Sequence, residues 1–174
     1  MKKLVVATPI FVLFIISIFV LIFLLTKTND QAPISPLINK QVPNFEMLSL
    51  FDDELLISNK NMQNKKVLIN FFASWCTPCK LEHHLFFEIK KEFSEIIIIG
   101  INHKDKKEDA INYIKEDGNP YNFIGVDFKG NVGFEFGVFG LPETFLINES
   151  GKIIYKKVGP LTKKIINNEI KPLL

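Results

Sequence analysis

The sequence predicts an α/β domain with a central mixed β-sheet and helices on both faces, preceded by a single N-terminal membrane-spanning helix. Three observations lead to this prediction. Residues 4–25 form one uncharged apolar run. Between residues 67 and 126, short apolar runs alternate with a segment of helical periodicity. Two further apolar runs flank a turn signal at residues 148–151. Alternation of strands and helices is typical of a sheet covered by helices.

The composition fits one domain with an appendage and argues against a nucleic-acid binder. The chain has 174 residues, and 47% of them are hydrophobic, including 17 phenylalanines, so a single core can be buried. The formal net charge is +2 and every basic residue is a lysine. Apart from Lys2 and Lys3, 19 lysines balance 19 acidic residues. Nucleic-acid binders show a basic stripe and arginine contacts, so we expect no nucleic-acid partner.

The apolar run at residues 4–25 is broken only by Thr8, Pro9 and Ser17. At about 1.5 Å per residue, a helix of this length spans the roughly 30 Å hydrocarbon core of a bilayer. A cleaved signal peptide is the competing interpretation, but its apolar region is about 7–15 residues long and ends in small residues. The segment after residue 25 offers no such cleavage site. The run therefore predicts a transmembrane anchor in the lipid bilayer.

Charges beside this run predict how the chain is oriented. Residues 1–3 contain Lys2 and Lys3, which favour a cytoplasmic N-terminus, although Lys27 on the far side weakens the bias. The rest of the chain is then expected outside the cytoplasm, where disulfide chemistry is possible.

A polar segment separates the expected anchor from the expected domain. Residues 26–41 contain Pro33 and Pro36 and have no helical or strand period, so they are expected to form an extended linker. The folded domain is expected at residues 42–174.

The first half of the domain is expected to contain a hairpin, a buried strand and a helix. Residues 42–50 and 55–58 are short apolar runs on either side of an acidic turn. Residues 67–73 form an almost continuous apolar run, which is typical of a strand covered on both faces. This run leads into two cysteines, after which apolar residues recur at helical spacing up to residue 93.

The second half continues the alternation and ends in a hairpin and a helix. Two apolar runs, residues 96–101 and 123–126, are expected strands. Between them, residues 106–117 have helical spacing, and Gly118 is placed to end that helix. A glycine-punctuated stretch at 127–136 leaves room for a short helix. The remaining expected elements are strands at 143–147 and 153–158 and a closing helix at 161–170.

Cys76 and Cys79 stand where the expected strand gives way to the expected helix. Outward-pointing N–H groups at a helix N-terminus stabilise a thiolate, and only the thiolate attacks a disulfide. Cys79 lies one helical turn further on, close enough to resolve a mixed disulfide. Pro78 falls in the first turn, where a missing N–H costs nothing. We therefore predict a redox-active disulfide, with Cys76 as the nucleophile and Cys79 as the resolving thiol.

Two other roles for this cysteine pair fit the sequence less well. The pair could be half of a zinc site, but no second cysteine pair exists, and His83, His84 and His103 lack the usual ligand spacing. A structural disulfide closing so small a loop would stabilise little. We therefore expect no metal and no cofactor beyond the dithiol itself.

The buried strand, the motif WCTPC at residues 75–79 and the later Leu141-Pro142 together resemble the thioredoxin superfamily. In that thioredoxin-like fold a cis proline lies opposite the cysteine pair, and the backbone before it pairs with the substrate. Pro142 matches the proline position, which the resemblance marks as part of the catalytic site. The residues that the resemblance places against substrate are Trp75, Thr77, Pro78 and Leu141.

Longer blocks make the resemblance narrower. The segments WCTPCKLEHH, GINHKDKKEDAINYIKEDGNPY, GVFGLPETFLI and GPLTKKIINNEIKPL are similar to the cytochrome c biogenesis thiol:disulfide interchange proteins of the DsbE/CcmG type, over nearly all of residues 42–174. This resemblance implies a periplasmic enzyme anchored in a bacterial inner membrane. It would take electrons from a membrane-embedded dithiol donor and reduce the haem-site cysteines of apocytochrome c, directly or through a maturation thiol protein.

Two alternative functions share the same fold. One is a general extracytoplasmic thiol–disulfide exchanger with other clients. The other is a non-catalytic module that binds apocytochrome or copper through its cysteines. Copper carriers of related fold use wider cysteine spacing with a matched histidine, and this sequence lacks the wider spacing.

The sequence departs from general thioredoxins at the acid beneath the dithiol. Six residues before the first cysteine thioredoxins commonly carry a buried aspartate, whereas this chain has Asn70, which cannot take a proton. Glu82, one turn past Cys79, and Glu143, next to Pro142, both match acidic positions of the narrower family. A nearby carboxylate raises the pKa of a thiol and can accept the proton of Cys79. Both glutamates are therefore candidate catalytic residues.

Overall fold

The computed structural model describes residues 2–26 and 35–174, and the chain divides into two compact units, Met1–Pro33 and Ile34–Leu174. The first unit contains helix α1 (Lys2–Thr26), whose apolar side chains between residues 11 and 23 are exposed. In the part of the chain that the structure describes, no helix has the length and apolar character needed to cross a membrane. The anchor expected at residues 4–25 stays a prediction. Half of the expected linker, residues 27–34, lies outside the described residues.

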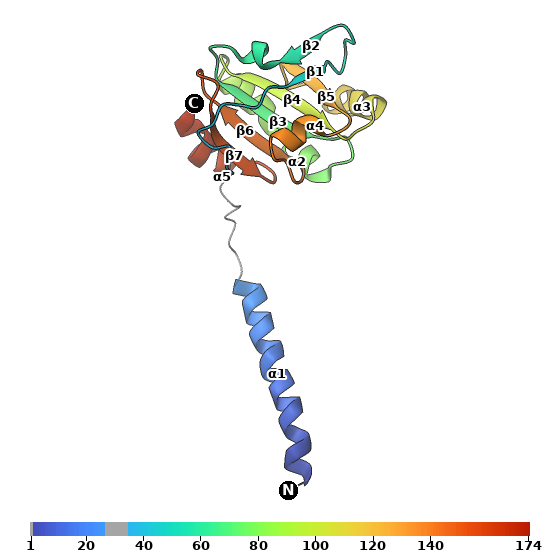
Figure 1. Cartoon of the computed structure of the whole chain (residues 1–174), viewed down its shortest axis with the longest axis vertical. Coiled ribbons are helices and arrows are strands. Elements are labelled where there is room, and N and C mark those ends of the chain that lie inside the picture. The colour runs from blue at the N-terminus through green and yellow to red at the C-terminus, as the bar shows by residue number, and fades with distance from the viewer. Residues whose placement is uncertain (1, 27–34) are drawn as a thin grey trace. The chain divides into compact units, whose positions relative to one another are not determined.

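The second unit is built around a five-stranded mixed sheet in the order β5-β4-β3-β6-β7 (Figure 1). Strands β3, β4 and β5 are parallel, while β6 and β7 are antiparallel to their neighbours. The five strands are β3 (Val67–Phe72), β4 (Ile97–His103), β5 (Phe123–Asp127), β6 (Glu143–Ile147) and β7 (Ile153–Val158). Each lies within two residues of an expected apolar run, so the α/β fold with a mixed sheet is confirmed.

One face of the sheet is covered by the long helices. Helices α2 (Thr77–Glu92) and α3 (Lys107–Asp117) connect β3 to β4 and β4 to β5. Each connection joins a strand to the next parallel strand in the same direction across the sheet, from β3 to β4 and from β4 to β5. Because such crossover connections are right-handed, both helices lie on the same face. The closing segment joins the same apolar cluster. It is not the one helix expected at 161–170 but three short pieces: α5 (Lys163–Ile165), a π-helical turn (Ile166–Ile170) and a 3-10 turn (Lys171–Leu173).

The opposite face is covered mainly by an antiparallel hairpin and an aromatic core. Strands β1 (Glu46–Leu48) and β2 (Leu56–Ser58) form the hairpin, and the 3-10 turn η1 (Asn59–Met62) and helix α4 (Asn131–Glu135) complete this layer. The core beneath them brings Phe71, Phe136 and Phe145 together, with ring centroids 5.3–5.7 Å apart. Helical turns thus cover both faces, although the long helices share one.

Side-chain alternation along β3 and β6 decides which face each polar residue meets. Leu68 and Phe72 of β3 pack in the cluster under α2, so Asn70, which lies between them, faces α2 as well. On β6 the same alternation puts Thr144 on the α2 face and Glu143 on the opposite face, since Leu146 and Phe145 belong to the two different clusters. The two faces therefore hold different polar groups.

Candidate active site

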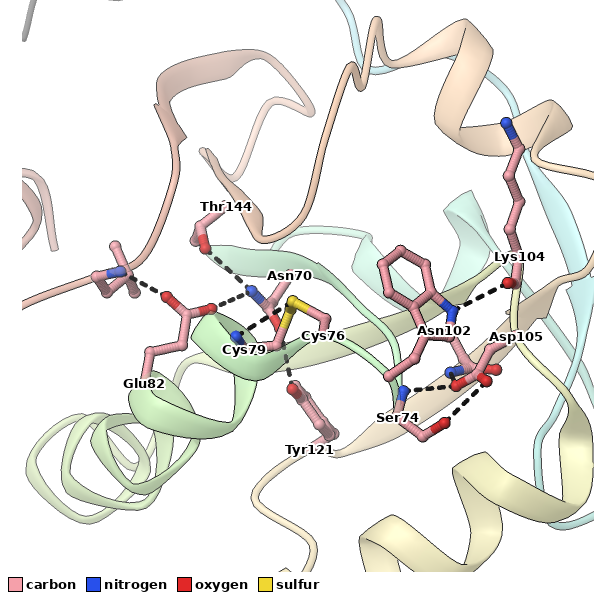
Figure 2. Close-up of a disulfide and its surroundings, with 12 residues drawn as sticks. Asn70, Ser74, Cys76, Cys79, Glu82, Asn102, Lys104, Asp105, Tyr121 and Thr144 are labelled. Atoms are coloured by element: carbon pink, nitrogen blue, oxygen red, sulfur yellow. Dashed lines mark hydrogen bonds between the residues drawn. A yellow bond between two sulfur atoms is a disulfide. The ribbon is translucent and has the colours of Figure 1, made fainter.

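Cys76 and Cys79 lie at the start of α2, just past the carboxyl end of β3 (Figure 2). They are joined by a disulfide, with Cα atoms 5.3 Å apart, and both are buried. Cys76 is the N-cap residue of α2, and its Sγ accepts a hydrogen bond from the Cys79 backbone N–H at 3.2 Å. This N–H and the helix dipole will stabilise a Cys76 thiolate once the disulfide is reduced.

A buried carboxyl group, Glu82, lies one helical turn beyond Cys79 on the same face of the sheet (Figure 2). Its Oε1 accepts a hydrogen bond from Nδ2 of Asn70 at 2.9 Å, and its Oε2 accepts one from the backbone N–H of Leu161. Burial raises the pKa of Glu82 to about 7, while the Leu161 and Asn70 hydrogen bonds act in the opposite direction. A carboxyl group with this pKa can take up and release a proton near neutral pH.

Asn70 joins this carboxyl group to two hydroxyl groups. Its Nδ2 also lies 3.1 Å from Oγ1 of Thr144, and its Oδ1 accepts a hydrogen bond from the Tyr121 hydroxyl at 2.9 Å. Tyr121 is buried, and burial raises its pKa well above the usual value, so its hydroxyl stays protonated. The amide thus ties Glu82 to β6 and to the loop before β5 (Figure 2).

A second polar cluster holds the turn that precedes Cys76. Asp105, in the turn after β4, is buried and accepts hydrogen bonds from the Ser74 backbone N–H at 2.6 Å and from the Ser74 hydroxyl at 2.9 Å. The Asn102 Nδ2 group donates to the same carboxylate at 2.9 Å, and so does the Lys106 N–H at 2.8 Å. The carboxyl ends of β3 and β4 are therefore fastened together beside the dithiol.

The three substrate-contact residues expected within the motif lie on the surface around the disulfide. The Trp75 side chain is 62% exposed, and its Nε1 donates a hydrogen bond to the Lys104 carbonyl at 3.2 Å (Figure 2). Thr77 is exposed and Pro78 is half-buried in the first turn of α2. The Trp75 ring is therefore held in place through its Nε1 group, while most of its surface is accessible to a binding partner.

The Leu141–Pro142 peptide bond is cis, with Leu141 half-buried and Pro142 buried. Strand β6 begins at the next residue and pairs antiparallel with β3, so that Glu143 lies opposite Phe71. Pro142 therefore lies at the end of β3 from which the chain continues to the cysteines.

The other candidate acid, Glu143, is fully buried on the opposite face of the sheet. Its Oε2 forms an ion pair with Lys156 Nζ at 2.9 Å, and its Oε1 accepts hydrogen bonds from the N–H groups of Phe139 at 2.9 Å and Gly140 at 3.4 Å. The structure thus brings Glu82 to the dithiol face and does not bring Glu143 there.

The histidines form hydrogen bonds away from the sulfur atoms. His83 Nε2 lies 2.9 Å from the Gly118 carbonyl, and His103 Nδ1 lies 2.9 Å from Oδ2 of Asp127. Among the described residues, no three histidine, cysteine, aspartate or glutamate side chains are grouped so as to hold a metal ion.

A protein-family model described as redoxin matches residues 37–171. The chain belongs to the redoxin family. The thioredoxin-like resemblance drawn from the sequence motifs is therefore confirmed.

Relatives of this redoxin are named as thiol:disulfide interchange proteins. DsbE of Pasteurella multocida is 35% identical over 166 residues, which cover 93% of this chain and 91% of the relative. DsbE of Escherichia coli K12 is 39% identical over 140 residues, 80% of this chain and 75% of the relative. CycY of Rhizobium leguminosarum is 37% identical over 118 residues, 68% of this chain and 63% of the relative. This redoxin is a thiol:disulfide interchange oxidoreductase of the thioredoxin type.

Solved structures share the fold at lower sequence identity. The thioredoxin domain of a thiol-disulfide oxidoreductase from Bacteroides vulgatus superposes with a TM-score of 0.69 at 21% identity, over 80% of this chain and 99% of that one. A secreted thiol-disulfide isomerase from Corynebacterium glutamicum superposes with a TM-score of 0.68 at 21% identity, over 76% and 84% of the two chains.

Sequence reasoning missed two residues of this redoxin's site. Asp105 stands just past a buried strand, and the carboxyl ends of parallel strands are where α/β sheets place their sites, so a signal was present. Tyr121 lies in a loop, and nothing in the sequence pattern connects it to Asn70, 51 residues earlier.

Proposed function

We propose that this chain reduces the haem-site cysteines of apocytochrome c, or of a maturation thiol protein, on the outer side of a bacterial inner membrane. The observation that carries the proposal is the Cys76–Cys79 pair at the N-terminus of α2 with the buried carboxyl group of Glu82 one turn away. The names of the relatives support thiol–disulfide exchange, and the resemblance of the motifs supports the cytochrome pathway. Haem attachment to cysteines needs free thiols, so a disulfide formed earlier must be reduced again.

The first half of the reaction forms a mixed disulfide. The Cys76 thiolate attacks one sulfur of the client disulfide, the client S–S bond breaks, and the departing client thiolate takes a proton from water. Cys76 suits this step because it caps α2 and its Sγ accepts the Cys79 N–H. The client is then held by one covalent bond to Cys76.

The second half releases the client. Glu82, in its carboxylate form, accepts the thiol proton of Cys79 from one helical turn away. The Cys79 thiolate attacks Cys76 Sγ, and the bond between Cys76 and the client breaks. The departing client thiolate takes up the proton held by Glu82, so the client leaves with its second thiol and Glu82 is again a carboxylate. Two electrons have passed to the client, and the chain is left with the Cys76–Cys79 disulfide that the structure contains. A dithiol donor in the membrane must then reduce this disulfide for another turnover.

The proposal includes attachment to the membrane through residues 4–25. These residues belong to α1, and the exposure of its apolar side chains between residues 11 and 23 supports a lipid environment. Lys2 and Lys3 support a cytoplasmic N-terminus, and a chain in this orientation has its catalytic domain on the periplasmic side.

The test is to trap the mixed disulfide with Cys79→Ser in the full-length chain expressed in its native membrane. Without Cys79, the adduct on Cys76 cannot be resolved, so it accumulates and is identified by non-reducing electrophoresis and mass spectrometry. The expected adduct is apocytochrome c or a dedicated maturation thiol protein, bonded through a haem-site cysteine.

Cys76→Ser is the matched control, because it keeps the other thiol but removes the proposed nucleophile. It should form no adduct. A broad set of unrelated secreted proteins on Cys76 would replace the cytochrome role by general thiol–disulfide exchange. No adduct in either variant would favour a binding module without turnover.

A further inference from the structure

The hydrogen bonds from Tyr121 through Asn70 to Glu82 have a direction. A side-chain amide has a donor end, Nδ2, and an acceptor end, Oδ1. The Tyr121 hydroxyl lies 2.9 Å from Oδ1, and Glu82 Oε1 lies 2.9 Å from Nδ2. The orientation of one buried amide therefore decides whether the glutamate meets a donor or an acceptor (Figure 2).

We propose that Tyr121 is a positioning residue that holds the Asn70 amide with its donor end toward Glu82 and so favours the carboxylate form of that group. The proposal rests on the role given above to Glu82 as the proton acceptor of Cys79. Tyr121 acts through Asn70 and touches neither sulfur in this assignment.

Two arrangements of these groups satisfy the carboxyl group. When Glu82 is ionised, both of its oxygens must accept, and the Asn70 Nδ2 and the Leu161 N–H supply the two donors. When Glu82 is protonated, its O–H needs an acceptor, and Asn70 supplies one only if the amide turns so that Oδ1 faces Glu82. The ionisation of Glu82 and the orientation of Asn70 are therefore coupled.

Tyr121 favours the first arrangement because its hydroxyl proton needs an acceptor. With the amide turned, Nδ2 would face the Tyr121 oxygen, and the buried hydroxyl proton would lose its partner, which costs free energy. Thr144 does not oppose this preference, because its hydroxyl can accept from Nδ2 or donate to Oδ1.

The groups around Glu82 allow the orientation of Asn70 to affect its pKa. Its pKa responds first to burial and then to the Leu161 and Asn70 hydrogen bonds. The nearby titratable groups outside α2 are Tyr113, in α3, and Tyr121, in the loop before β5, and burial raises the pKa of both. On α2 itself, burial lowers the pKa of His83, which is bonded to a backbone carbonyl.

Tyr113 provides a matched control. Both tyrosine rings are buried and contact the rings of Phe72 and His83. Within the described part of the chain, however, the Tyr113 hydroxyl has no hydrogen-bond partner. Tyr113→Phe therefore removes the same atom from the same cluster without touching the amide.

The experiment follows the carboxyl carbon of Glu82 by ¹³C NMR in the oxidised full-length chain, solubilised in detergent, as pH is varied. The resonance is assigned by its loss in Glu82→Gln. In Tyr121→Phe the amide is free to offer Oδ1 to a protonated Glu82, so the titration midpoint should rise by about one pH unit, a roughly tenfold gain in proton affinity. Tyr113→Phe should leave the midpoint where it is.

An unchanged midpoint in Tyr121→Phe, or the same rise in both variants, overturns the proposal. A measurement on the unaltered protein covers the case in which Tyr121→Phe does not fold. The side-chain N–H₂ signals of Asn70 should titrate with the Glu82 midpoint, and signals insensitive to pH overturn the proposal as well. A raised midpoint without a matching shift in the pH profile of thiol–disulfide exchange supports the positioning by Tyr121 but removes Glu82 from the proposed reaction.

Discussion

At the scale of single residues, Glu82 links the stability of the fold to pH in the opposite sense to an ordinary ion-paired carboxylate. Burial raises its pKa from 4.5 to about 7, so the folded state binds this proton more tightly than the unfolded state. The stabilisation is complete below pH 4.5 and is lost as pH rises through about 7. We expect the free energy of unfolding of the oxidised protein to fall by up to about 3 kcal/mol over this range, measured by urea denaturation.

The Glu82→Gln variant isolates this effect from other titrating groups. Burial lowers the pKa of His83, so its contribution is lost as pH falls below its usual 6.5 and partly masks the Glu82 trend. His83 is present in both proteins, and its contribution cancels when the two are compared at each pH. A difference between them that stays flat from pH 4.5 to 8 would show that Glu82 is not the group responsible.

At the scale of elements, the turn after β4 fixes the turn before α2. The Asp105 carboxylate accepts four hydrogen bonds, from Ser74, Asn102 and Lys106. Asp105→Ala leaves these donors without their acceptor, and we expect a loss of about 2–4 kcal/mol in unfolding free energy, read from chemical denaturation. Asp105→Asn, which keeps one acceptor oxygen, should fall between the alanine variant and the unaltered protein.

The exposed Asp109 in the first turn of α3 offers a control of the same residue type. Asp109→Ala should cost less than about 1 kcal/mol, because only its favourable interaction with the helix N-terminus is lost. Equal losses at both positions would mean that the Asp105 hydrogen bonds contribute little to the turn.

The ion pair of Glu143 and Lys156 joins β6 to β7 within the core. Glu143 is fully buried, and the Lys156 side chain is 7% exposed. Glu143→Gln leaves a buried ammonium group without its counter-ion, so we expect a loss of about 3–5 kcal/mol, with a similar loss for Lys156→Met. The double variant should lose less than the sum of the two, as measured by urea denaturation. If Glu143→Gln keeps its stability but slows exchange, Glu143 has the catalytic role first expected from the sequence.

The elements show what could be predicted from the sequence. The strands were predictable because buried strands in a mixed sheet are continuous apolar runs, as in residues 67–73. The closing segment was not, because its helical spacing does not distinguish one α-helix from a succession of α, π and 3-10 turns. The sequence could not show which of the two glutamates lies on the same face of the sheet as the dithiol, because that depends on the face to which each side chain points. The position of the Glu82 carboxylate also depends on a hydrogen bond from the backbone N–H of Leu161, which is 79 residues away in the sequence.

At the scale of the whole molecule, the chemistry belongs to one of the two compact units. The dithiol, Asn70, Glu82, Tyr121 and both apolar clusters lie within Ile34–Leu174. A chain starting at residue 35 should therefore keep the unfolding midpoint and the exchange rate of the full-length protein. It should leave the membrane fraction, because residues 4–25 are absent. Sedimentation with membranes despite their absence would place the membrane contact elsewhere in the chain.

A chain starting at residue 42 should be less stable than one starting at 35. The Asn39 N–H donates to the Ile153 carbonyl at 2.8 Å, and the Ile153 N–H donates to the Lys40 carbonyl at 3.0 Å. The shorter chain loses both backbone bonds at the start of β7, and each is worth about 0.5–1.5 kcal/mol. We expect a loss of about 1–3 kcal/mol in urea denaturation with little change in exchange rate, because these bonds lie at the end of β7 away from the cysteines. Equal midpoints for the two chains would place the start of the cooperative unit at residue 42, with residues 35–41 contributing only to the connection with the first unit.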